Sequence, residues 1–324
     1  MVLWACVCIF FLSFLFTALL LRPLIAILKR HHMGQSILEI GPAWHKSKEG
    51  TPTMGGSVFL LTVPLFSLLG SYLLDGKLSS TLIFVLLFSL ANGFIGLLDD
   101  RTKLKNKQNQ GLLPWQKLFL QSFFVGAFLY LLLRFGDVDY ALAIPYIRFT
   151  LGWGIPLIFV FFIASLGILN CANLSDGIDG LTASSTFVIG AFFIFEGALS
   201  KEHTLTALGL SLCGTMLGFL IFNHHPAKIF MGDTGSLFLG ALVVGGSFLM
   251  KNPVIMPIYT FLFLLEGGSV ILQVLVFKRT GKRLFRMAPL HHHLEKCGWS
   301  ENSIVLVFSV ITLLACLFAH LALL

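Results

Sequence analysis

Long apolar runs recur from one end of this chain to the other, and they constrain its fold more than any other feature. Each run is long enough to cross a hydrocarbon core, which takes about 20 helical residues. Only α-helices and closed β-barrels satisfy every backbone hydrogen bond within lipid. The runs are continuous rather than alternating, so we interpret them as helices. Ten spans are predicted, at residues 3–28, 56–74, 81–98, 115–134, 154–171, 182–197, 204–222, 235–250, 254–277 and 303–323.

The composition agrees with this reading. Hydrophobic residues make up 56% of the chain, charged residues only 11%, and the mean hydropathy is +0.90. A soluble domain buries its apolar side chains in one core, and this chain has more than one core holds. We therefore predict an all-α polytopic membrane protein with a single integral membrane domain, residues 1–324. Within it, segment 136–153 is expected to form a short hairpin between two spans.

Lysine and arginine are distributed unequally between alternate loops. Cytoplasmic loops of membrane proteins carry an excess of these residues. The loops on the opposite side hold only five of the 22. Sixteen fall in the segments 29–55, 99–117, 172–181, 223–234 and 278–302. This asymmetry predicts that these five segments are cytoplasmic and that both termini lie on the extracytoplasmic side.

Aspartates gather on the predicted cytoplasmic face, in a chain with only 15 acidic residues. Crowded carboxylates repel one another unless a cation lies between them. Ligand sets made only of oxygen favour Mg²⁺, with Mn²⁺ as a second possibility, over zinc. The sequence thus predicts a divalent metal and an active site at this face. Its carboxylates are Asp99, Asp100, Asp176, Asp179 and Asp233.

The spacing of these aspartates leads to more specific expectations. Asp99 and Asp100 are adjacent, so on a helix their side chains diverge by roughly 100°. We expect the third span to end there if both are to reach one small target; otherwise one binds metal and the other meets a substrate. Asp176 and Asp179 share a face if their stretch is helical. The alternative for any single aspartate is a helix cap or a solvated side chain. Asp99 and Asp100 are expected at a helix C-terminus, where the helix dipole disfavours negative charge, so capping does not explain them.

Basic residues on the same face point to phosphate. Lys48, which lies in a segment that also holds Thr51 and Thr53, is expected near the aspartates together with Lys103 and Lys117. Phosphoryl transfer relies on metal ions and cations to stabilise charge on phosphate oxygens. The alternative for lysine is general attraction to anionic lipid. We favour that alternative for Lys105, Lys107, Lys278, Arg279, Lys282 and Arg283.

Three consecutive histidines, His291, His292 and His293, follow a basic stretch. Consecutive side chains do not readily ligate one ion, so a zinc site with Cys297 is the weaker interpretation. Imidazoles are able to donate hydrogen bonds to a pyrophosphate or to orient a sugar. A solvated loop is the remaining alternative.

Taken together, these motifs resemble the phospho-N-acetylmuramoyl-pentapeptide transferase family, part of the polyprenyl-phosphate N-acetylhexosamine-1-phosphate transferase superfamily. The aspartate motifs alone indicate only the superfamily. The threonine-proline motif and the histidine triplet followed by GWSE indicate the peptidoglycan branch. The motifs run in order along nearly the whole chain, at 51–56 (TPTMGG), 99–100 (DD), 173–181 (NLSDGIDGL), 230–236 (FMGDTGS), 288–293 (APLHHH) and 298–301 (GWSE).

The resemblance implies a Mg²⁺-dependent homodimer in the bacterial plasma membrane. It implies transfer of phospho-N-acetylmuramoyl-pentapeptide from its UDP carrier to undecaprenyl phosphate, giving lipid I and UMP, with membrane lipid as a partner and no nucleic acid. Asp233 would ligate the metal, and Phe230 would stack on uracil. The implied catalytic residues are Asp99, Asp100 and Asp176, with His291, His292 and His293 on the sugar-phosphate side. The implied substrate-binding residues are Lys48, Asn173, Asp179, Asn223 and Phe230, and the charge argument above adds Thr53, Lys103 and Lys117.

Two alternatives remain open at this stage. A superfamily member that uses UDP-N-acetylglucosamine would share the aspartates, although the histidine triplet argues against it. A transporter would need polar groups deep in the bilayer, and Glu266 beside Gly267 and Gly268 is the strongest candidate for such a group. An interhelical hydrogen bond at a helix break would explain Glu266 equally well. The sequence also leaves open whether transfer is direct or passes through a phospho-enzyme.

Overall fold

The computed structural model describes residues 2–31, 34, 48–106, 111–137, 141–144, 149–152 and 154–324. Within this part of the chain, ten helices are long and apolar enough to cross a membrane, so the predicted number of spans is confirmed. A short 3₁₀ turn, η2 (Gly55–Val58), leads into the second of them. The ten are α1 (Val2–Arg30), α2 (Phe59–Asp75), α3 (Ser80–Asn106), α4 (Pro114–Phe135), α5 (Ile155–Leu174), α6 (Leu181–Ser200), α7 (His203–Asn223), α8 (Gly232–Leu249), α10 (Phe261–Thr280) and α12 (Glu301–Leu321).

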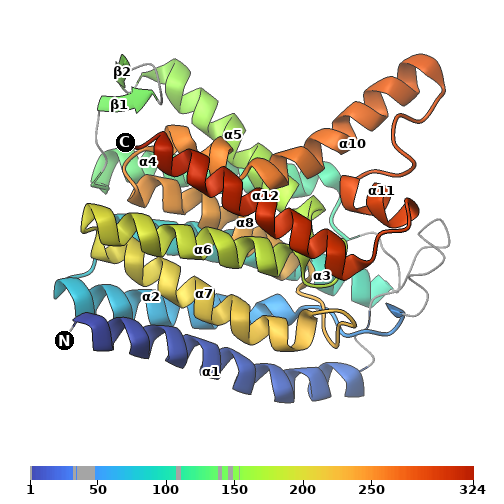
Figure 1. Cartoon of the computed structure of the whole chain (residues 1–324), viewed down its shortest axis with the longest axis horizontal. Coiled ribbons are helices and arrows are strands. Elements are labelled where there is room, and N and C mark those ends of the chain that lie inside the picture. The colour runs from blue at the N-terminus through green and yellow to red at the C-terminus, as the bar shows by residue number, and fades with distance from the viewer. Residues whose placement is uncertain are drawn as a thin grey trace.

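Helix α8 lies inside the bundle, with α3 and α5 among the helices packed on it (Figure 1). Every residue from 234 to 249 is buried. By contrast, α1 and α12 expose large apolar side chains such as Leu3, Phe11, Leu306 and Phe318. Exposed apolar faces of this kind are what lipid contact requires. The N-terminus of α8 is therefore held in place from several sides, which suits it to carry a precisely positioned side chain.

The two termini lie at the same end of the bundle (Figure 1). The short helix α11 (Leu290–Lys296), which carries the histidine triplet, lies at the other end. A hairpin near the termini joins α4 to α5, and its strands β1 (Ala141–Ile144) and β2 (Phe149–Gly152) pair antiparallel with Ala141 opposite Gly152. The expected hairpin is thus confirmed, except that residues 138–140, 145–148 and 153 lie outside the described residues.

The sequence led us to expect that helix α3 would end at its two aspartates, but it does not. It continues to Asn106, and Lys103 Nζ lies 2.6 Å from Asp99 Oδ2 one turn earlier. Such i,i+4 pairs stabilise a helix beyond its apolar part. The prediction that the third span ends at residue 98 was therefore wrong by two turns.

The ninth span also differs from its prediction of 254–277. A 3₁₀ turn, η3 (Pro253–Ile255), and a four-residue helix, α9 (Met256–Tyr259), precede a break at Thr260, and α10 starts at Phe261. Pro253 and Pro257 lie in the first turns of η3 and α9, where a helix does not need the N–H that proline lacks, so they favour separate helix starts at these positions. No break occurs at Gly267 or Gly268, so Glu266 lies within an unbroken helix.

Candidate active site

Asp233, in the first turn of α8, is surrounded by side chains from three other spans. Its Oδ2 lies 2.7 Å from Lys117 Nζ of α4 and 3.1 Å from Lys103 Nζ of α3. Its Oδ1 accepts a hydrogen bond of 3.1 Å from the amide of Asn173, on the last turn of α5. Lys117 Nζ also donates to Asn173 Oδ1 at 3.2 Å. The predicted grouping of this aspartate with two lysines is therefore present.

Asp100 holds the start of α8. Its Oδ1 accepts from the backbone N–H of Asp233 at 3.1 Å, and its Oδ2 accepts from the backbone N–H and the hydroxyl of Thr234 at 3.0 and 2.7 Å. The first N–H groups of a helix have no partner within it. Asp100 thus caps α8 from α3, which corrects our argument that capping does not explain this residue. Asp100 lies near the C-terminal end of its own helix but caps the N-terminus of another.

Asp99 completes an acidic group that is able to hold a cation. One oxygen each from Asp99, Asp100 and Asp233 lie within 4.8 Å of one another. Adjacent aspartates on a continuing helix therefore do approach one target, contrary to our expectation, because side-chain reach compensates for their divergence. Two contacts fix the side chain of Asp99: its Oδ1 accepts from the backbone N–H of Leu112 at 2.8 Å, and its Oδ2 pairs with Lys103.

The threonine-proline segment packs against the chain just before α8. The N–H of Phe230 donates to Pro52 O at 2.8 Å, and the N–H of Gly55 donates back to Phe230 O at 2.8 Å. Gly232 has a φ of +71°, and a Cβ there would lie 2.5 Å from Asp100 Oδ2 and 2.9 Å from Thr53 Oγ1. Only glycine is free of strain in this conformation. Thr53 is consequently placed beside Asp100, whereas the ring of Phe230 remains half-buried.

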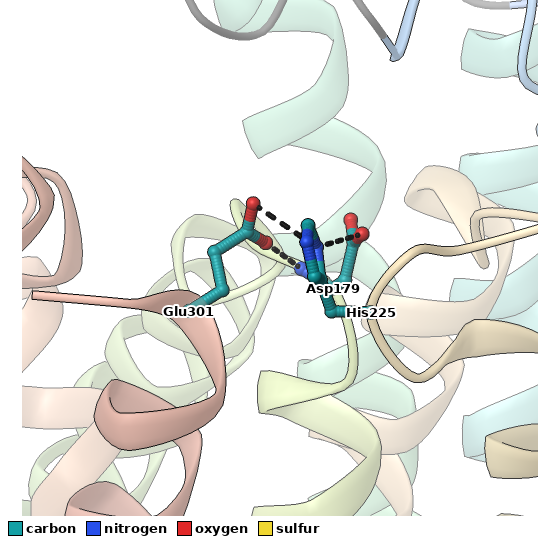
Figure 2. A group of neighbouring side chains, drawn as sticks. All are labelled: Asp179, His225 and Glu301. Atoms are coloured by element: carbon teal, nitrogen blue, oxygen red, sulfur yellow. Dashed lines mark hydrogen bonds and ion pairs between the residues drawn. The ribbon is translucent and has the colours of Figure 1, made fainter.

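A second polar cluster forms around Asp179, away from the three-aspartate group. Lys48 Nζ lies 2.7 Å from both Asp179 Oδ1 and Glu301 Oε2. His225 Nδ1 lies 3.0 Å from Asp179 Oδ2 and 3.4 Å from Glu301 Oε1. Figure 2 shows how these three side chains come together. Glu301 Oε2 also accepts from the backbone N–H of Asp179 at 3.0 Å. The carboxylates of Asp179 and Glu301 and the imidazole of His225 each offer one ligand atom, and these atoms lie close enough together to hold a cation. Lys48 already supplies that positive charge.

Asp176 and Asp179 do not share a helical face, because residues 175–180 form turns. Asp176 is half-buried, and burial, followed by the charges of Asp233 and Asp100, raises the pKa of its carboxyl to about 8. Asn223 is buried and holds the two loops together. Its Oδ1 accepts from the N–H of Gly180 at 3.1 Å, and its amide donates to Ile229 O at 2.8 Å.

The three histidines point to different surroundings. His291 is fully buried, and its Nδ1 lies 3.0 Å from Glu266 Oε2. His292 Nδ1 lies 2.6 Å from Glu295 Oε2. His293 Nδ1 accepts from the backbone N–H of Arg286 at 3.2 Å. The histidines therefore do not converge on one point. The contact with His291 accounts for a carboxylate at position 266 within a span, so no transport pathway is needed to explain it.

Two residues of the second cluster were not predicted as site residues from the sequence: His225, and Glu301, which was noted only as part of the GWSE motif. Glu301 follows Ser300, which caps α12 by accepting from Ser303 N at 3.3 Å. An acidic residue at the start of a span, on the same predicted face as the aspartates, was an available signal. His225 carried no comparable signal, because its contact with Asp179 depends on the loop between α7 and α8.

Comparison with known proteins is consistent with this arrangement. The model of glycosyl transferase family 4 matches residues 82–251. The phospho-N-acetylmuramoyl-pentapeptide-transferase of Clostridium botulinum (strain Alaska E43) is 40% identical over 315 residues, which cover 96% of this chain and 94% of that protein. The protein of the same name from Oceanobacillus iheyensis is 40% identical, with 93% of each chain covered. That from Carboxydothermus hydrogenoformans is 42% identical, with 90% and 91% covered.

Proposed function

This chain belongs to the phospho-N-acetylmuramoyl-pentapeptide-transferases of glycosyl transferase family 4, and on that premise we propose its reaction. The enzyme transfers phospho-N-acetylmuramoyl-pentapeptide from UDP-N-acetylmuramoyl-pentapeptide to undecaprenyl phosphate. The products are lipid I and UMP, and the step serves peptidoglycan biosynthesis.

The observation that best supports this reaction is the convergence of Lys103 and Lys117 on Asp233. Both substrates bring phosphate groups, and the transferred phosphoryl group gathers charge on its oxygens. Two ammonium groups at one point neutralise such charge. The anionic diphosphate of the donor then draws these lysines away from Asp233, which leaves the aspartate free to accept a different cation.

Mg²⁺ fits the acidic group next to these lysines. The donors are carboxylate oxygens alone, which suits a hard cation. Asp233 and Asp99 would hold the ion, and Asp100, whose two oxygens accept three hydrogen bonds from α8, would orient Asp233. When bound, Mg²⁺ polarises the phosphoryl oxygens and neutralises their charge.

The acceptor needs little help from a base. A phosphate monoester has a second pKa of about 6, so the lipid phosphate is mostly dianionic at neutral pH. Asp99 is engaged by Lys103 and by the N–H of Leu112, so it is poorly placed to attack as a nucleophile itself. We therefore favour direct attack by the lipid phosphate, with Lys103 and Lys117 aligning the phosphates.

The nucleotide is expected to bind beside Phe230. The backbone of Phe230 is fixed on both sides by residues 52 and 55, so its half-buried ring is available for stacking on uracil. Lys48 and Asp179 form a close ion pair. We expect this pair to line the base of the nucleotide pocket and to stay in place when the nucleotide binds. Asn173 and Asn223, whose amides are used within the protein, would position Asp233 and the loop at Gly180 respectively.

We also propose that the enzyme is a homodimer with a single integral membrane domain in the bacterial plasma membrane, with its active site facing the cytoplasm. The positive-inside distribution of lysine and arginine supports this orientation. Cysteine labelling of intact cells tests it, in a background without Cys8 and Cys297, which are exposed. Lys77→Cys should react with an impermeant maleimide, and Lys282→Cys should react only after the cells are opened. The reverse pattern would invert the topology.

Release of UMP from UDP-N-acetylmuramoyl-pentapeptide by the purified protein, with and without undecaprenyl phosphate, tests the reaction. We expect release that depends on both the lipid and Mg²⁺, and none from UDP-N-acetylglucosamine. Lys103→Met should abolish release, whereas Lys105→Met, an exposed lysine of the same helix, should preserve it. Turnover of UDP-N-acetylglucosamine at a similar rate would instead favour the other branch of the superfamily.

A further inference from the structure

Glu301, the first residue of α12, joins three segments that lie far apart in the chain. Its Oε2 lies 2.7 Å from Lys48 Nζ and accepts from the backbone N–H of Asp179 at 3.0 Å. Its Oε1 lies 3.4 Å from Nδ1 of His225, which also contacts Asp179 (Figure 2). The last span therefore meets the loop after α5, the loop after α7 and the segment that carries Lys48 through one carboxylate.

Two carboxylates hold the ammonium group of Lys48. Its Nζ lies 2.7 Å from Asp179 Oδ1 and 2.7 Å from Glu301 Oε2. An ammonium group has three N–H donors on one nitrogen. Two acceptors at this distance prevent its rotation, so the direction of the third N–H is fixed. Among the residues that the structure describes, Lys48 makes no other hydrogen bond. The third N–H is therefore an oriented donor without a partner in this part of the chain.

Neither carboxylate would orient the ammonium alone, because the group would rotate about a single bond. Asp179 is itself fixed, since its Oδ2 accepts from the backbone N–H of Ala227 at 2.9 Å. Ion pairs on the surface contribute little, because solvent competes with them and both side chains move. Here the side chains of Lys48, Asp179 and Glu301 are only 14%, 1% and 9% exposed. The two bonds to Lys48 are accordingly ordered ones.

Open space lies beside this group of side chains. Glu301 and His225 line a cavity of about 370 Å³, together with Trp299 and other residues between α11 and α12. Small-molecule sites begin at about 300 Å³. A ligand of that size is therefore able to reach the group from outside, although all of its carboxylate charge is paired within the protein.

We propose that Glu301 is a positioning residue, which together with Asp179 orients Lys48 so that its third N–H donates to an oxygen of the donor nucleotide. Uracil, ribose and diphosphate all carry oxygen acceptors, so UDP presents the matching chemistry. This inference rests on the proposed function, because it takes the donor to be a UDP-linked substrate. It adds that the last span takes part in nucleotide binding through Lys48.

Glu301→Ala provides the test. Without the second acceptor the ammonium of Lys48 rotates about its bond to Asp179. We expect the affinity for UDP, measured by calorimetry in detergent, to fall by about tenfold, the scale of one hydrogen bond from a charged group. The KM for UDP-N-acetylmuramoyl-pentapeptide should rise equally, and kcat and the KM for undecaprenyl phosphate should stay unchanged. Unchanged affinity for UDP would overturn the proposal, and so would an equal fall in kcat, which indicates a general structural role.

A double variant separates action through Lys48 from an independent effect. Losses at independent sites multiply, whereas losses within one interaction do not. If Glu301 acts through Lys48, then Glu301→Ala should lower the affinity for UDP no further in a Lys48→Met background. A double variant that loses the product of the two single losses would contradict the proposal.

Glu202→Ala is a matched control. Glu202 precedes the first residue of α7, as an acidic residue at the start of a span, and its Oε1 lies 2.5 Å from Lys251 Nζ. Removal of this carboxylate also breaks a pair with a lysine from another loop. The affinity for UDP should stay at the wild-type value, and a tenfold fall here would show that such losses are not specific to Glu301.

Glu301→Gln keeps the test decisive if Glu301→Ala does not fold. The amide oxygen of glutamine still accepts from Lys48, so this variant should retain more affinity for UDP than Glu301→Ala and show the same dependence on Lys48. We expect both variants to fold, because Ile304 and Phe308 of α12 pack with Ile178 and Leu181. If the wild-type protein itself neither binds UDP nor releases UMP, the proposed function fails instead.

Discussion

Asp100 accepts a hydrogen bond from the backbone N–H of Asp233, so one active-site aspartate positions the other. The contact joins α3 to the first turn of α8, and two further bonds from Thr234 reinforce it. A negative charge at this point is also favoured by the dipole of α8. The acidic motif of the third span thus acts partly through the backbone of the eighth.

Asp100→Asn should destabilise the protein. Asparagine keeps the shape of aspartate but offers one acceptor oxygen, so at least one buried N–H of α8 loses its partner. Such a loss costs about 1–3 kcal/mol. We expect a lower melting temperature in EDTA, and a smaller decrease for Thr234→Val, which removes one of the three bonds. An Asp100→Asn variant as stable as the wild type would show that the cap contributes little.

Asp233→Asn should abolish Mg²⁺-dependent turnover and leave the protein folded. The amide retains the shape of the side chain but loses the charge that holds a hard cation. We expect kcat to fall by about 10²–10³-fold, the scale of losing one electrostatic group from an active site. UMP release at several Mg²⁺ concentrations, alongside a thermal melt, measures both effects. Unchanged activity with unchanged Mg²⁺ dependence would refute the metal assignment.

The pH dependence of stability reports on Asp176. Its carboxyl has a pKa near 8 in the folded protein, and about 4 in an unfolded chain. The folded state therefore holds a proton that the unfolded state releases, so the stability from this group falls as the pH rises from about 4 to 8. Asp176→Asn removes the titration. In EDTA we expect the variant to melt above the wild type at pH 8 and close to it at pH 4.5. A gap of the same size at both pH values would contradict the assignment.

Phe230→Ala should weaken binding of the UDP-substrate more than it lowers kcat. Loss of a base-aromatic stack costs about 1–3 kcal/mol and is felt equally in the ground and transition states. The backbone bonds of Phe230 to residues 52 and 55 persist without the ring, so the loop should keep its position. Initial rates at varied donor concentration separate the two effects. A fall in kcat at constant KM would mean that the ring shapes the catalytic centre.

The spans and the aspartate–lysine grouping could be predicted because they depend on local properties. Apolar runs mark the helices, and the excess of lysine on one set of loops brings Lys103 and Lys117 to the same face as Asp233. The break before α10 could not be predicted from apolarity, since the residues around Thr260 are as apolar as a span. Helix α3 passed its predicted end because charged residues with i,i+4 partners continue a helix in water.

The detailed geometry of the site depends on contacts between residues far apart in the chain. Asp100 caps a helix 133 residues later, and Lys48 pairs with Glu301 across 253 residues. No periodicity or motif spacing encodes such a pair. For the same reason Glu266 was recognised as unusual in a span, while its partner His291 became apparent only when α10 and α11 were placed together.

Asp99→Asn distinguishes direct transfer from a phospho-enzyme. If the lipid phosphate attacks directly, the variant should keep measurable activity that rises with pH around 6, where the remaining monoanion ionises. If Asp99 is an obligatory nucleophile, the variant should be inactive at every pH, and the wild type should release UMP without lipid. We expect the first outcome, because Asp99 is already held by Lys103 at 2.6 Å and by the N–H of Leu112 at 2.8 Å. A burst of UMP equal to the amount of lipid-free wild-type enzyme would reverse this conclusion.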